Sequence, residues 1–320
     1  MEKDKIFEVC KQNAATTVLY FPDRGNWGSS SYPGNCSGWI VASLIYRYGC
    51  NSVAEIFAGG GTTYDLCQDL KMPYVGIDLN PNPVRPGIIS MDILDDNIEL
   101  PDGFYSADLQ FLHPPYPTIN DIHYSGATWA DTANVGNRDI QEMSWEKGMQ
   151  AINKAILRGY AAMAPGSYQA VLCGDIRRKG SFHSMLNELA IPGELVQILV
   201  KMQHNTNSGF KNCNYGKRNF FLIEHEFIAV IKKPSGYEIA YTIPKSYAID
   251  VRDSKTATWK DIVLSVMNKL GSADLQTIYR EIDGHKRCET NPHWKDKVRQ
   301  TLQEYSCFKN ISRGVWRLVA

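Results

Sequence analysis

The chain has 320 residues, of which 43% are hydrophobic and 21% are charged. This composition is typical of a globular protein, and the length favours one large domain with a smaller one. Lys and Arg number 34, as do Asp and Glu, so the formal net charge is zero. A protein that coats nucleic acid with its whole surface is basic, so the balance excludes that class and leaves local basic patches.

No two of the eight cysteines are spaced as C-x-x-C, and none forms a Cys/His cluster with zinc-type spacing. We therefore expect buried free thiols, a reducing cytoplasm and no structural metal. The charged segment Met1–Lys5 is followed by no apolar stretch, and no run of eighteen apolar residues occurs. We expect neither a targeting peptide nor a membrane partner.

Strand and helix patterns alternate from about residue 50 to 235. The predicted strands are Val53–Phe57, Tyr74–Asp78, Gly87–Asp92, Ser106–Leu112, Tyr168–Cys173, Glu194–Lys201 and Glu226–Lys232. The predicted helices are Thr62–Leu70, Ser144–Ala164 and Phe182–Leu189. The alternation is typical of an α/β protein with a doubly wound parallel sheet, which binds ligands at the carboxyl ends of its strands.

A different pattern follows a predicted linker at residues 236–255. Helices are predicted at Trp259–Leu270, Ser272–Ile282 and Asn291–Tyr305, and two short strands within Phe308–Leu318. Residues 256–320 carry 11 Lys and Arg against 7 Asp and Glu, about +4, which leaves about −4 for the rest. This order predicts a small winged helix-turn-helix domain that contacts phosphates. The basic residues of its third helix and wing are Lys295, Lys297, Arg299, Lys309, Arg313 and Arg317.

A glycine-rich segment follows the first of these strands, since Glu55 to Thr63 reads EIFAGGGTT. Glycines let the backbone approach a ligand, and the helix that follows offers free N–H groups. The segment lacks the Gly-Lys-Ser/Thr of a phosphate-binding loop, and an ordinary tight turn is the alternative. Asp78 ends the next strand, where ribose hydroxyls are bound in nucleotide-type sheets. Asp92 is placed either to accept from an adenine amino group or to cap a turn.

The segment His113-Pro114-Pro115-Tyr116 directly follows another predicted strand. Its prolines fix the backbone and remove two N–H donors, which leaves outward carbonyl acceptors. Tyr116 offers a flat face on which a base can stack. The Pro114 carbonyl and the His113 side chain are candidate acceptors for the N–H groups of an amino group, which would favour a nucleophilic, pyramidal nitrogen. A polyproline turn is the structural alternative.

Together these two motifs resemble those of the amino-directed DNA methyltransferases, which methylate adenine N6 or cytosine N4. Glu55–Gly61 matches the family's D/E-x-F-x-G-x-G cofactor motif, and Pro114, Pro115 and Tyr116 match its D/N/S-P-P-Y/F catalytic motif. The resemblance covers about residues 15–235. It implies a Rossmann-like class I methyltransferase domain at residues 1–235, with S-adenosyl-L-methionine as cofactor.

Other segments look like further parts of this family. Tyr32–Ser37 (YPGNCS) with the helix Gly38–Tyr48 is similar to its extra cofactor-binding segment. Gly174–Gly180 and His225–Ile228 look like its later core strands. The residues expected to bind the cofactor are Asn35, Cys36, Ser37, Glu55, Phe57, Ala58, Gly59, Gly61, Thr62, Thr63, Asp78, Leu79, Asp92 and Ile93.

His113 departs from the family pattern. Members with Asn or Asp at this position are usually adenine enzymes, and those with Ser are usually cytosine N4 enzymes. A neutral imidazole accepts one hydrogen bond, whereas an imidazolium accepts none. We therefore expect activity to fall as the pH drops through the pKa of His113.

A base inside a duplex cannot reach such a pocket, so base flipping is implied. Two polar, aromatic-containing loops, at about residues 117–146 and 201–220, are candidates to fill the gap and to read base edges, and solvated loops are the alternative. The residues predicted to contact DNA are Tyr124, Trp129, Lys211, Lys217, Arg218, Lys295, Lys297, Arg299 and Arg313.

The preferred interpretation is a sequence-specific DNA methyltransferase, with adenine N6 preferred over cytosine N4. Direct transfer from a sulfonium needs neither a metal nor a covalent enzyme intermediate. The expected partner is double-stranded DNA in a cytoplasmic, prokaryotic or phage-encoded setting. A restriction or defence nuclease partner and the oligomeric state stay open.

Three alternatives also stay open. Pro-Pro-Tyr sites serve enzymes that methylate RNA bases or a protein glutamine amide. A non-catalytic DNA-binding regulator that kept a cofactor pocket is compatible with His113. A Rossmann dehydrogenase is less favoured, because Pro-Pro-Tyr has no role there.

Overall fold

The computed structural model describes residues 1–21, 23–29, 31–117, 129, 135, 138–178, 181–203, 220–234 and 257–319. Contacts within the chain divide it into two compact units, residues 1–245 and 246–320. The boundary falls inside the predicted linker. No helix among the described residues is long and apolar enough to cross a membrane.

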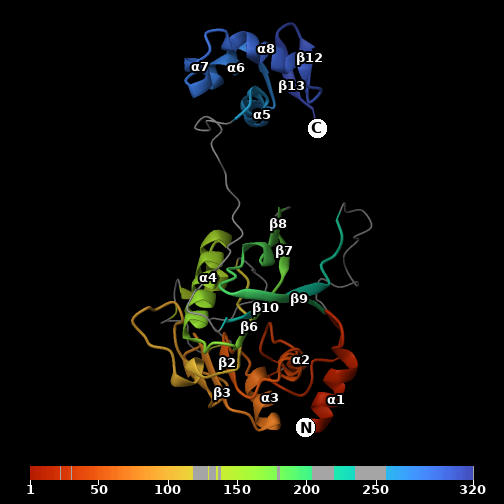
Figure 1. The fold of residues 1–320 in the computed structure, drawn as a ribbon, viewed down its shortest axis with the longest axis vertical. Coiled ribbons are helices and arrows are strands. Elements are labelled where there is room, and N and C mark those ends of the chain that lie inside the picture. Colours follow the sequence, from red (N-terminus) through yellow and green to blue (C-terminus); the bar gives the residue numbers. More distant parts are fainter. Residues whose placement is uncertain are drawn as a thin grey trace. The chain divides into compact units, whose positions relative to one another are not determined.

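An eight-stranded sheet forms the centre of the first unit, in the order β1-β9-β10-β6-β5-β2-β3-β4 (Figure 1). Its strands are β1 (Val18–Leu19), β2 (Val53–Ile56), β3 (Tyr74–Asp78), β4 (Ile88–Ser90), β5 (Leu109–Leu112), β6 (Tyr168–Cys173), β9 (Glu194–Met202) and β10 (His225–Lys232). The chain adds β3 and β4 on one side of β2 but β5 and β6 on the other, so the order reverses between β2 and β5. The prediction of a Rossmann-like doubly wound sheet is confirmed.

The sheet is not parallel throughout. Strand β10 runs antiparallel to both of its neighbours, β6 and β9, whereas the other neighbouring pairs are parallel. Neighbouring antiparallel strands need no crossover helix between them, whereas parallel strands do. A fully parallel sheet was expected, and among the described strands only β10 departs from it by running in the opposite direction.

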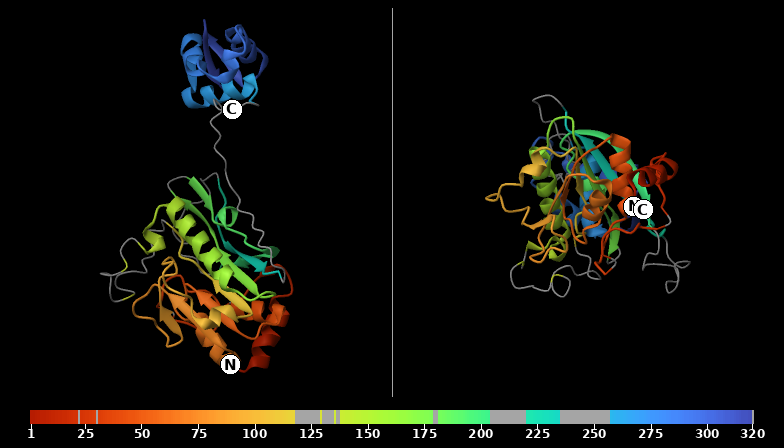
Figure 2. Two further views of the ribbon diagram at one scale, coloured as in Figure 1. Left: turned by 60° about the vertical axis from the view of Figure 1, so that its left-hand side comes forward. Right: turned by 90° about the horizontal axis from the view of Figure 1, so that it is seen from below.

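Helices cover both faces of this sheet. One core cluster joins strand residues to α1 (Lys3–Asn13), α2 (Gly38–Tyr48) and α3 (Thr62–Leu70). The other joins the opposite faces of the strands to α4 (Trp145–Ala162), which Figure 2 shows lying across the strands. Strands β2 and β5 are buried at every residue, which explains their continuous apolar sequence. The remaining short helices are η1 (Asp102–Tyr105), η3 (Ile140–Glu142) and η4 (Leu186–Glu188).

The segment after β6 differs from the prediction. Gly174–Gly180 does not supply a core strand, because β7 (Asp175–Arg178) pairs with β8 (Ser181–Ser184) in a separate two-stranded sheet. The helix predicted at Phe182–Leu189 is wrong, since this segment contains β8 and then the 3-10 turn η4. Phe182, which gave the apolar spacing of a helix, is half exposed instead of buried.

The second unit has its own apolar core. Its elements are α5 (Trp259–Leu270), β11 (Ser272–Asp274), α6 (Leu275–Ile282), α7 (Lys286–Glu289), α8 (Trp294–Glu304), β12 (Phe308–Ser312) and β13 (Val315–Leu318). The three strands form a sheet in the order β11-β13-β12. Ser272–Asp274 was expected to be helical, but it pairs with β13, and Asp274 then caps α6.

Candidate functional site

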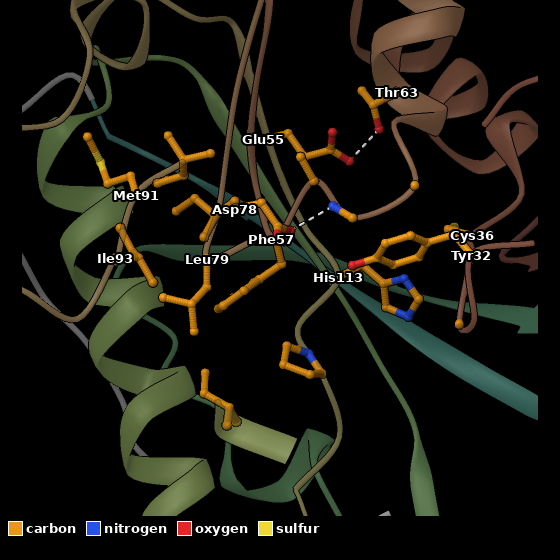
Figure 3. A pocket seen from close by; sticks show the side chains of 18 of the residues that line it. Tyr32, Cys36, Glu55, Phe57, Thr63, Asp78, Leu79, Met91, Ile93 and His113 are labelled. Atoms are coloured by element: carbon orange, nitrogen blue, oxygen red, sulfur yellow. Dashed lines mark hydrogen bonds between the residues drawn. The ribbon is translucent and has the colours of Figure 1, made fainter. Parts of the chain in front are cut away.

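A pocket lies at the carboxyl ends of β2, β3, β4 and β5, next to the reversal of strand order. The atom-free space in and before it is about 900 Å³, a value that includes the solvent at its open mouth. Figure 3 shows Tyr32, Cys36 and His113 on one side and Leu79, Met91 and Ile93 on the other. The glycine turn therefore shares one cavity with His113 and Pro115 of the HPPY motif.

The turn after β2 has a backbone that most residues avoid. Phe57 has φ +66°, Gly59 +45° and Gly61 +76°. A bulky residue at positive φ is a true outlier, and such strain gathers at functional sites. This conformation ends β2 at Ile56, one residue before the predicted end.

The YPGNCS segment packs on this turn. A Cβ atom on Gly59 would lie 3.1 Å from the Tyr32 ring, and one on Gly60 would lie 3.2 Å from Asn35 Oδ1. Thr62 Oγ1 donates to Asn35 Oδ1, which ties the segment to the start of α3. Glycines are needed here because Tyr32 and Asn35 occupy the space of a side chain.

Asp78, at the end of β3, is held by backbone donors. Its Oδ2 accepts from Gly59 N at 2.7 Å, and its Oδ1 accepts from Asn80 N at 2.9 Å. Burial raises the pKa of the Asp78 carboxyl, and these two hydrogen bonds oppose the rise. The carboxylate thus fixes the glycine turn while it lines the pocket.

Glu55 lies on β2 beneath the turn. Its Oε1 accepts from Thr63 Oγ1 at 2.5 Å, and its Oε2 accepts from Tyr74 OH at 2.6 Å. Burial raises the pKa of this carboxyl to about 8. Glu55 is therefore mostly protonated at neutral pH, and its contacts anchor α3 and β3.

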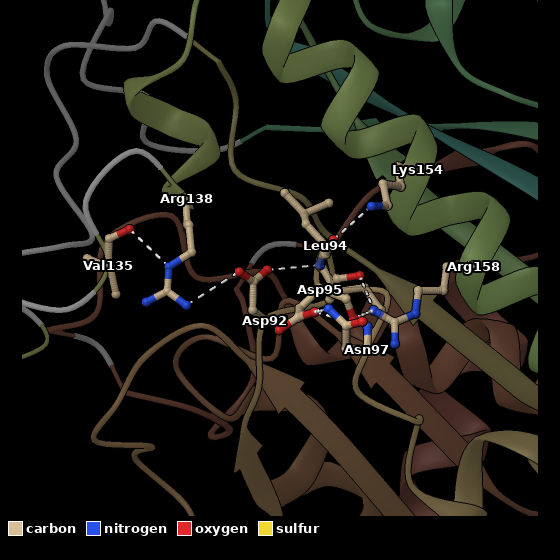
Figure 4. A network of polar contacts seen from close by, with 9 residues as sticks. Asp92, Leu94, Asp95, Asn97, Val135, Arg138, Lys154 and Arg158 are labelled. Atoms are coloured by element: carbon tan, nitrogen blue, oxygen red, sulfur yellow. Dashed lines mark hydrogen bonds and ion pairs between the residues drawn. The ribbon is translucent and has the colours of Figure 1, made fainter.

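Asp92 lies in a loop that α4 holds in place (Figure 4). Its Oδ1 accepts from Leu94 N at 2.9 Å, and its Oδ2 lies 3.5 Å from Arg138 Nη1. Arg158 and Lys154 of α4 donate to main-chain oxygens of the same loop. Asp92 is thus both a turn-capping and a pocket-lining residue.

Four pocket residues come from beyond the HPPY motif, and sequence reasoning singled out only the first of them: Trp129, Arg138, Asp139 and Ile140. Asp139 is 2% exposed, and its Oδ2 has no hydrogen-bond partner among the described residues. Only its acidic type and its position after a long polar segment could have indicated it. Trp129 is buried, and its indole N–H donates to Tyr32 OH at 3.0 Å. The indole thus forms part of the pocket wall, and the DNA contact of Trp129 stays a prediction.

Tyr116 is fixed by a buried ion pair that the sequence prediction did not include. Its hydroxyl donates to Glu226 Oε1 at 2.6 Å, and Lys201 forms an ion pair with the other carboxylate oxygen. Lys201 and Glu226 are register partners on β9 and β10. A Cβ atom on Gly174 would lie 2.9 Å from Tyr116 OH, so the ring packs against bare backbone there.

The charges of the same ion pair, Lys201 and Glu226, act on the His113 side chain. Its ring lies 6.1 Å from the Tyr116 ring, nearly perpendicular to it. Burial lowers the pKa of His113 to about 4, and Lys201 adds to this shift while Glu226 opposes it. The imidazole is therefore neutral from about pH 5 upward. The fall in activity that is expected at the pKa of His113 therefore belongs near pH 4.

Glu226 keeps its charge in this position. Burial would raise its pKa, but the Lys201 ammonium, His113 and the hydrogen bonds from Lys201 and Tyr116 hold the pKa at about 2. An unpaired buried carboxylate would be costly, so Lys201 is required for the charge.

Most of the predicted site residues line this pocket, with four that lie beside it in the chain and are absent from its lining: Ser37, Gly61, Pro114 and Tyr116. Four predicted DNA contacts fall outside the described residues: Tyr124, Lys211, Lys217 and Arg218. Arg313 is exposed in the β12–β13 turn, as are the predicted basic residues of α8: Lys295, Lys297 and Arg299. Arg299 pairs with Asp296 of the same helix. The described residues contain no group of three His, Cys, Asp or Glu side chains that could hold a metal ion.

Neither a protein-family model nor a curated protein matches the chain. Among solved structures, the chain is similar to the N-methyltransferase NodS from Bradyrhizobium japonicum WM9, in complex with S-adenosyl-L-homocysteine. The identity is 12%, the TM-score is 0.35, and the match covers 72% of this chain and 99% of that one.

Two further solved structures are similar over part of the chain. TTHA0409, a candidate DNA modification methylase from Thermus thermophilus complexed with S-adenosyl-L-methionine, is 15% identical with a TM-score of 0.24, covering 50% of this chain and 57% of that one. A 16S rRNA (adenine(1408)-N(1))-methyltransferase from Catenulisporales acidiphilia is 12% identical with a TM-score of 0.31. The match covers 57% of this chain and 89% of that one.

Likenesses this distant say nothing about substrate. The fold is defined by this chain's own sheet, in which β4-β3-β2-β5-β6-β10-β9 runs with β10 alone reversed. That order is the one of the class I methyltransferase fold.

Proposed function

We propose that the protein is an S-adenosyl-L-methionine-dependent methyltransferase that acts on the exocyclic amino group of a flipped DNA base, with adenine N6 preferred. The observation that carries this proposal is the shared pocket, in which His113 and Pro115 meet the glycine turn and Asp78. A nucleotide-type turn and a ring-gripping motif in one cavity are what transfer to a base amino group requires.

The pocket fits the cofactor in two respects. The turn brings bare backbone to the cavity at the end of β2, and Asp78 and Asp92 line it at the ends of the next two strands. Asp139 adds a buried carboxylate oxygen without a partner among the described residues, which suits a ligand that brings N–H or O–H donors. We assign cofactor binding to the turn, Asp78 and Asp92. When bound, S-adenosyl-L-methionine supplies a methyl group activated by a positive sulfur.

The chain's own groups orient the base and its amino group. Tyr116 presents its ring to the base, and its tether to Glu226 fixes the ring plane. The Pro114 carbonyl and the neutral His113 imidazole accept from the two N–H groups of the amine. A nitrogen that gains a methyl group must lose one proton, which passes to solvent, so His113 acts as a hydrogen-bond acceptor. Adenine is preferred because a neutral imidazole replaces the acceptor that Asn or Asp provides in adenine enzymes.

Support for duplex DNA comes from the second unit. Its helices, its three-stranded sheet and its net charge of about +4 fit a winged-helix module. We propose that α8 and the β12–β13 turn contact DNA phosphates. Double-stranded DNA is accordingly the proposed partner.

The direct test is expression in a host that lacks DNA methylation, followed by modification-sensitive sequencing. We expect N6-methyladenine within one recognition sequence for the wild type and a lower methylated fraction of the same sites for Tyr116→Ala. N4-methylcytosine would change the base and keep the reaction class.

The same preparation should be assayed with labelled cofactor on DNA, tRNA and total protein. Label in tRNA or protein alone would overturn the DNA assignment. Cofactor binding without transfer to any of the three would favour a non-catalytic DNA-binding regulator.

A further inference from the structure

The β7–β8 ribbon has no place in the sheet or in either core of the first unit. It starts at Asp175, immediately after Gly174, against which the Tyr116 ring packs. Figure 1 shows β7 and β8 apart from the strands of the eight-stranded sheet. An isolated two-stranded ribbon is marginal in water, so further contacts must support it. One joins it to the first unit, because the ring centre of His183 lies 4.7 Å from that of Trp145 on α4.

Arg177 is the central side chain of this ribbon. Its guanidinium carbon lies 5.5 Å from the ring centre of Phe182, its register partner, and 4.3 Å from that of Phe220. Arg177 is exposed, and it forms no ion pair with any residue that the structure describes. A guanidinium stacked on rings keeps its N–H edge free to donate to two oxygens of an anion such as a phosphate.

The ribbon also has the charge of a nucleic-acid contact. The sequence from Asp175 to Ser184 reads DIRRKGSFHS, with three cations and one acid, within a chain of zero net charge. Exposed aromatic rings interleaved with Arg are the combination that binds unpaired nucleic acid. Phe220 is the last residue of the segment for which base reading is predicted, so the end of that segment lies against the ribbon.

We propose that the β7–β8 ribbon binds the phosphodiester backbone beside the flipped base, with Arg177 as the phosphate contact and Phe182 and Phe220 as its support. This inference rests on the proposed function and names a contact of the same site. Because Gly174 joins the ribbon to the Tyr116 ring, a phosphate held at Arg177 positions its strand next to HPPY.

The test measures binding of a short duplex with one mismatched base across a series of salt concentrations. Arg177→Gln should lower affinity roughly tenfold, the size of one charge-assisted hydrogen bond. The slope of log affinity against log salt should fall by about one. Arg177→Lys should keep the slope and lose part of the affinity, because it keeps the charge without the planar stack.

Lys232→Gln is the matched control. Lys232 also lies over an aromatic ring, 5.5 Å from the centre of Tyr168, at the opposite end of β6. It should leave both affinity and slope unchanged. Calorimetric affinity for S-adenosyl-L-homocysteine should be the same in all variants, which shows that the pocket is intact.

Arg177→Gln with wild-type affinity and slope would overturn the ribbon's role while DNA methylation by the wild type still stands. An equal loss in Lys232→Gln would also overturn it, since any surface cation would then serve. If the wild type binds S-adenosyl-L-homocysteine but neither binds nor methylates DNA, the proposed function is wrong. DNA is then also wrong as the partner of the ribbon.

Discussion

The two ends of the pocket are held by different kinds of contact. At the glycine-turn end (residues 55–63 with Asp78 and Asp92), Asp78 and Asp92 accept from backbone N–H groups that are at most 19 residues away in the chain. At the HPPY end (residues 113–116 with Lys201 and Glu226), Tyr116 depends on a side chain 110 residues away. The first end is built by local chain geometry, whereas the second needs the completed sheet.

The largest expected effect on stability and turnover comes from a substitution that disrupts the HPPY end. Glu226→Leu removes the acceptor of Tyr116 and leaves the Lys201 ammonium buried without its partner. Losing one member of a buried pair costs about 3–5 kcal/mol of the free energy of unfolding. The urea midpoint of unfolding should drop accordingly, and turnover should fall with it.

The double variant Lys201→Met with Glu226→Leu separates these two effects. Replacing both charges with apolar groups of similar size is often neutral for stability. We expect most of the stability to return while turnover stays low, because Tyr116 still lacks its acceptor. Full recovery of turnover would show that the tether has no role in the reaction.

The next effect tests the ring itself. Tyr116→Ala removes the face on which the base stacks, and such stacking is worth about 1–3 kcal/mol. We expect turnover to fall by about fivefold to a hundredfold, with unchanged calorimetric affinity for S-adenosyl-L-homocysteine. Tyr116→Phe keeps the ring and removes only the hydroxyl, so it should lie between Ala and the wild type. A loss of cofactor affinity in either variant would contradict the assignment of Tyr116 to the base.

The difference between the ends also explains what the sequence could predict. Glycines after one strand and an acid at the end of the next strand form a pattern within a short stretch of sequence, so a ligand-binding turn can be predicted there. The structure places Gly59 and Asp78 of this pattern in contact. The pairing of Lys201 with Glu226 depends on the register of β9 and β10, which no local pattern contains. The β7–β8 ribbon was missed for a related reason, since Phe182 has the spacing of a buried helical residue but faces Arg177.

A smaller effect concerns the glycine-turn end. Asp78→Asn keeps an acceptor but loses the charge that Gly59 N and Asn80 N bind. Hydrogen bonds to a charged group contribute about 1.5–3 kcal/mol, so affinity for S-adenosyl-L-homocysteine should weaken about tenfold to a hundredfold. Turnover at saturating cofactor should change little, because the HPPY end is untouched. Asp102→Asn, in η1 and outside the pocket lining, is the control and should bind like the wild type.

The smallest effects are in pH dependence, and they have opposite signs at the two ends. The folded pKa of Glu55, about 8, is above its ordinary value of 4.5. Its contribution to stability is therefore fully present below about pH 4.5 and is lost as the pH rises through 8. We expect Glu55→Gln, which stays neutral, to flatten the fall of the urea midpoint between about pH 5 and 8. An unchanged slope in this variant would assign the fall to other groups.

His113 at the other end has a folded pKa of about 4, below its ordinary value of 6.5. Its contribution is present above pH 6.5 and is lost as the pH falls through 4. The imidazole is thus a constant acceptor at neutral pH, and turnover at saturating cofactor should be flat from about pH 6 to 8.5 as far as His113 is concerned. His113→Asn supplies an acceptor that does not titrate, so it should retain turnover and lose any decline below pH 5. A steep fall between pH 7 and 6 in the wild type that His113→Asn removes would show instead that this histidine titrates in its usual range.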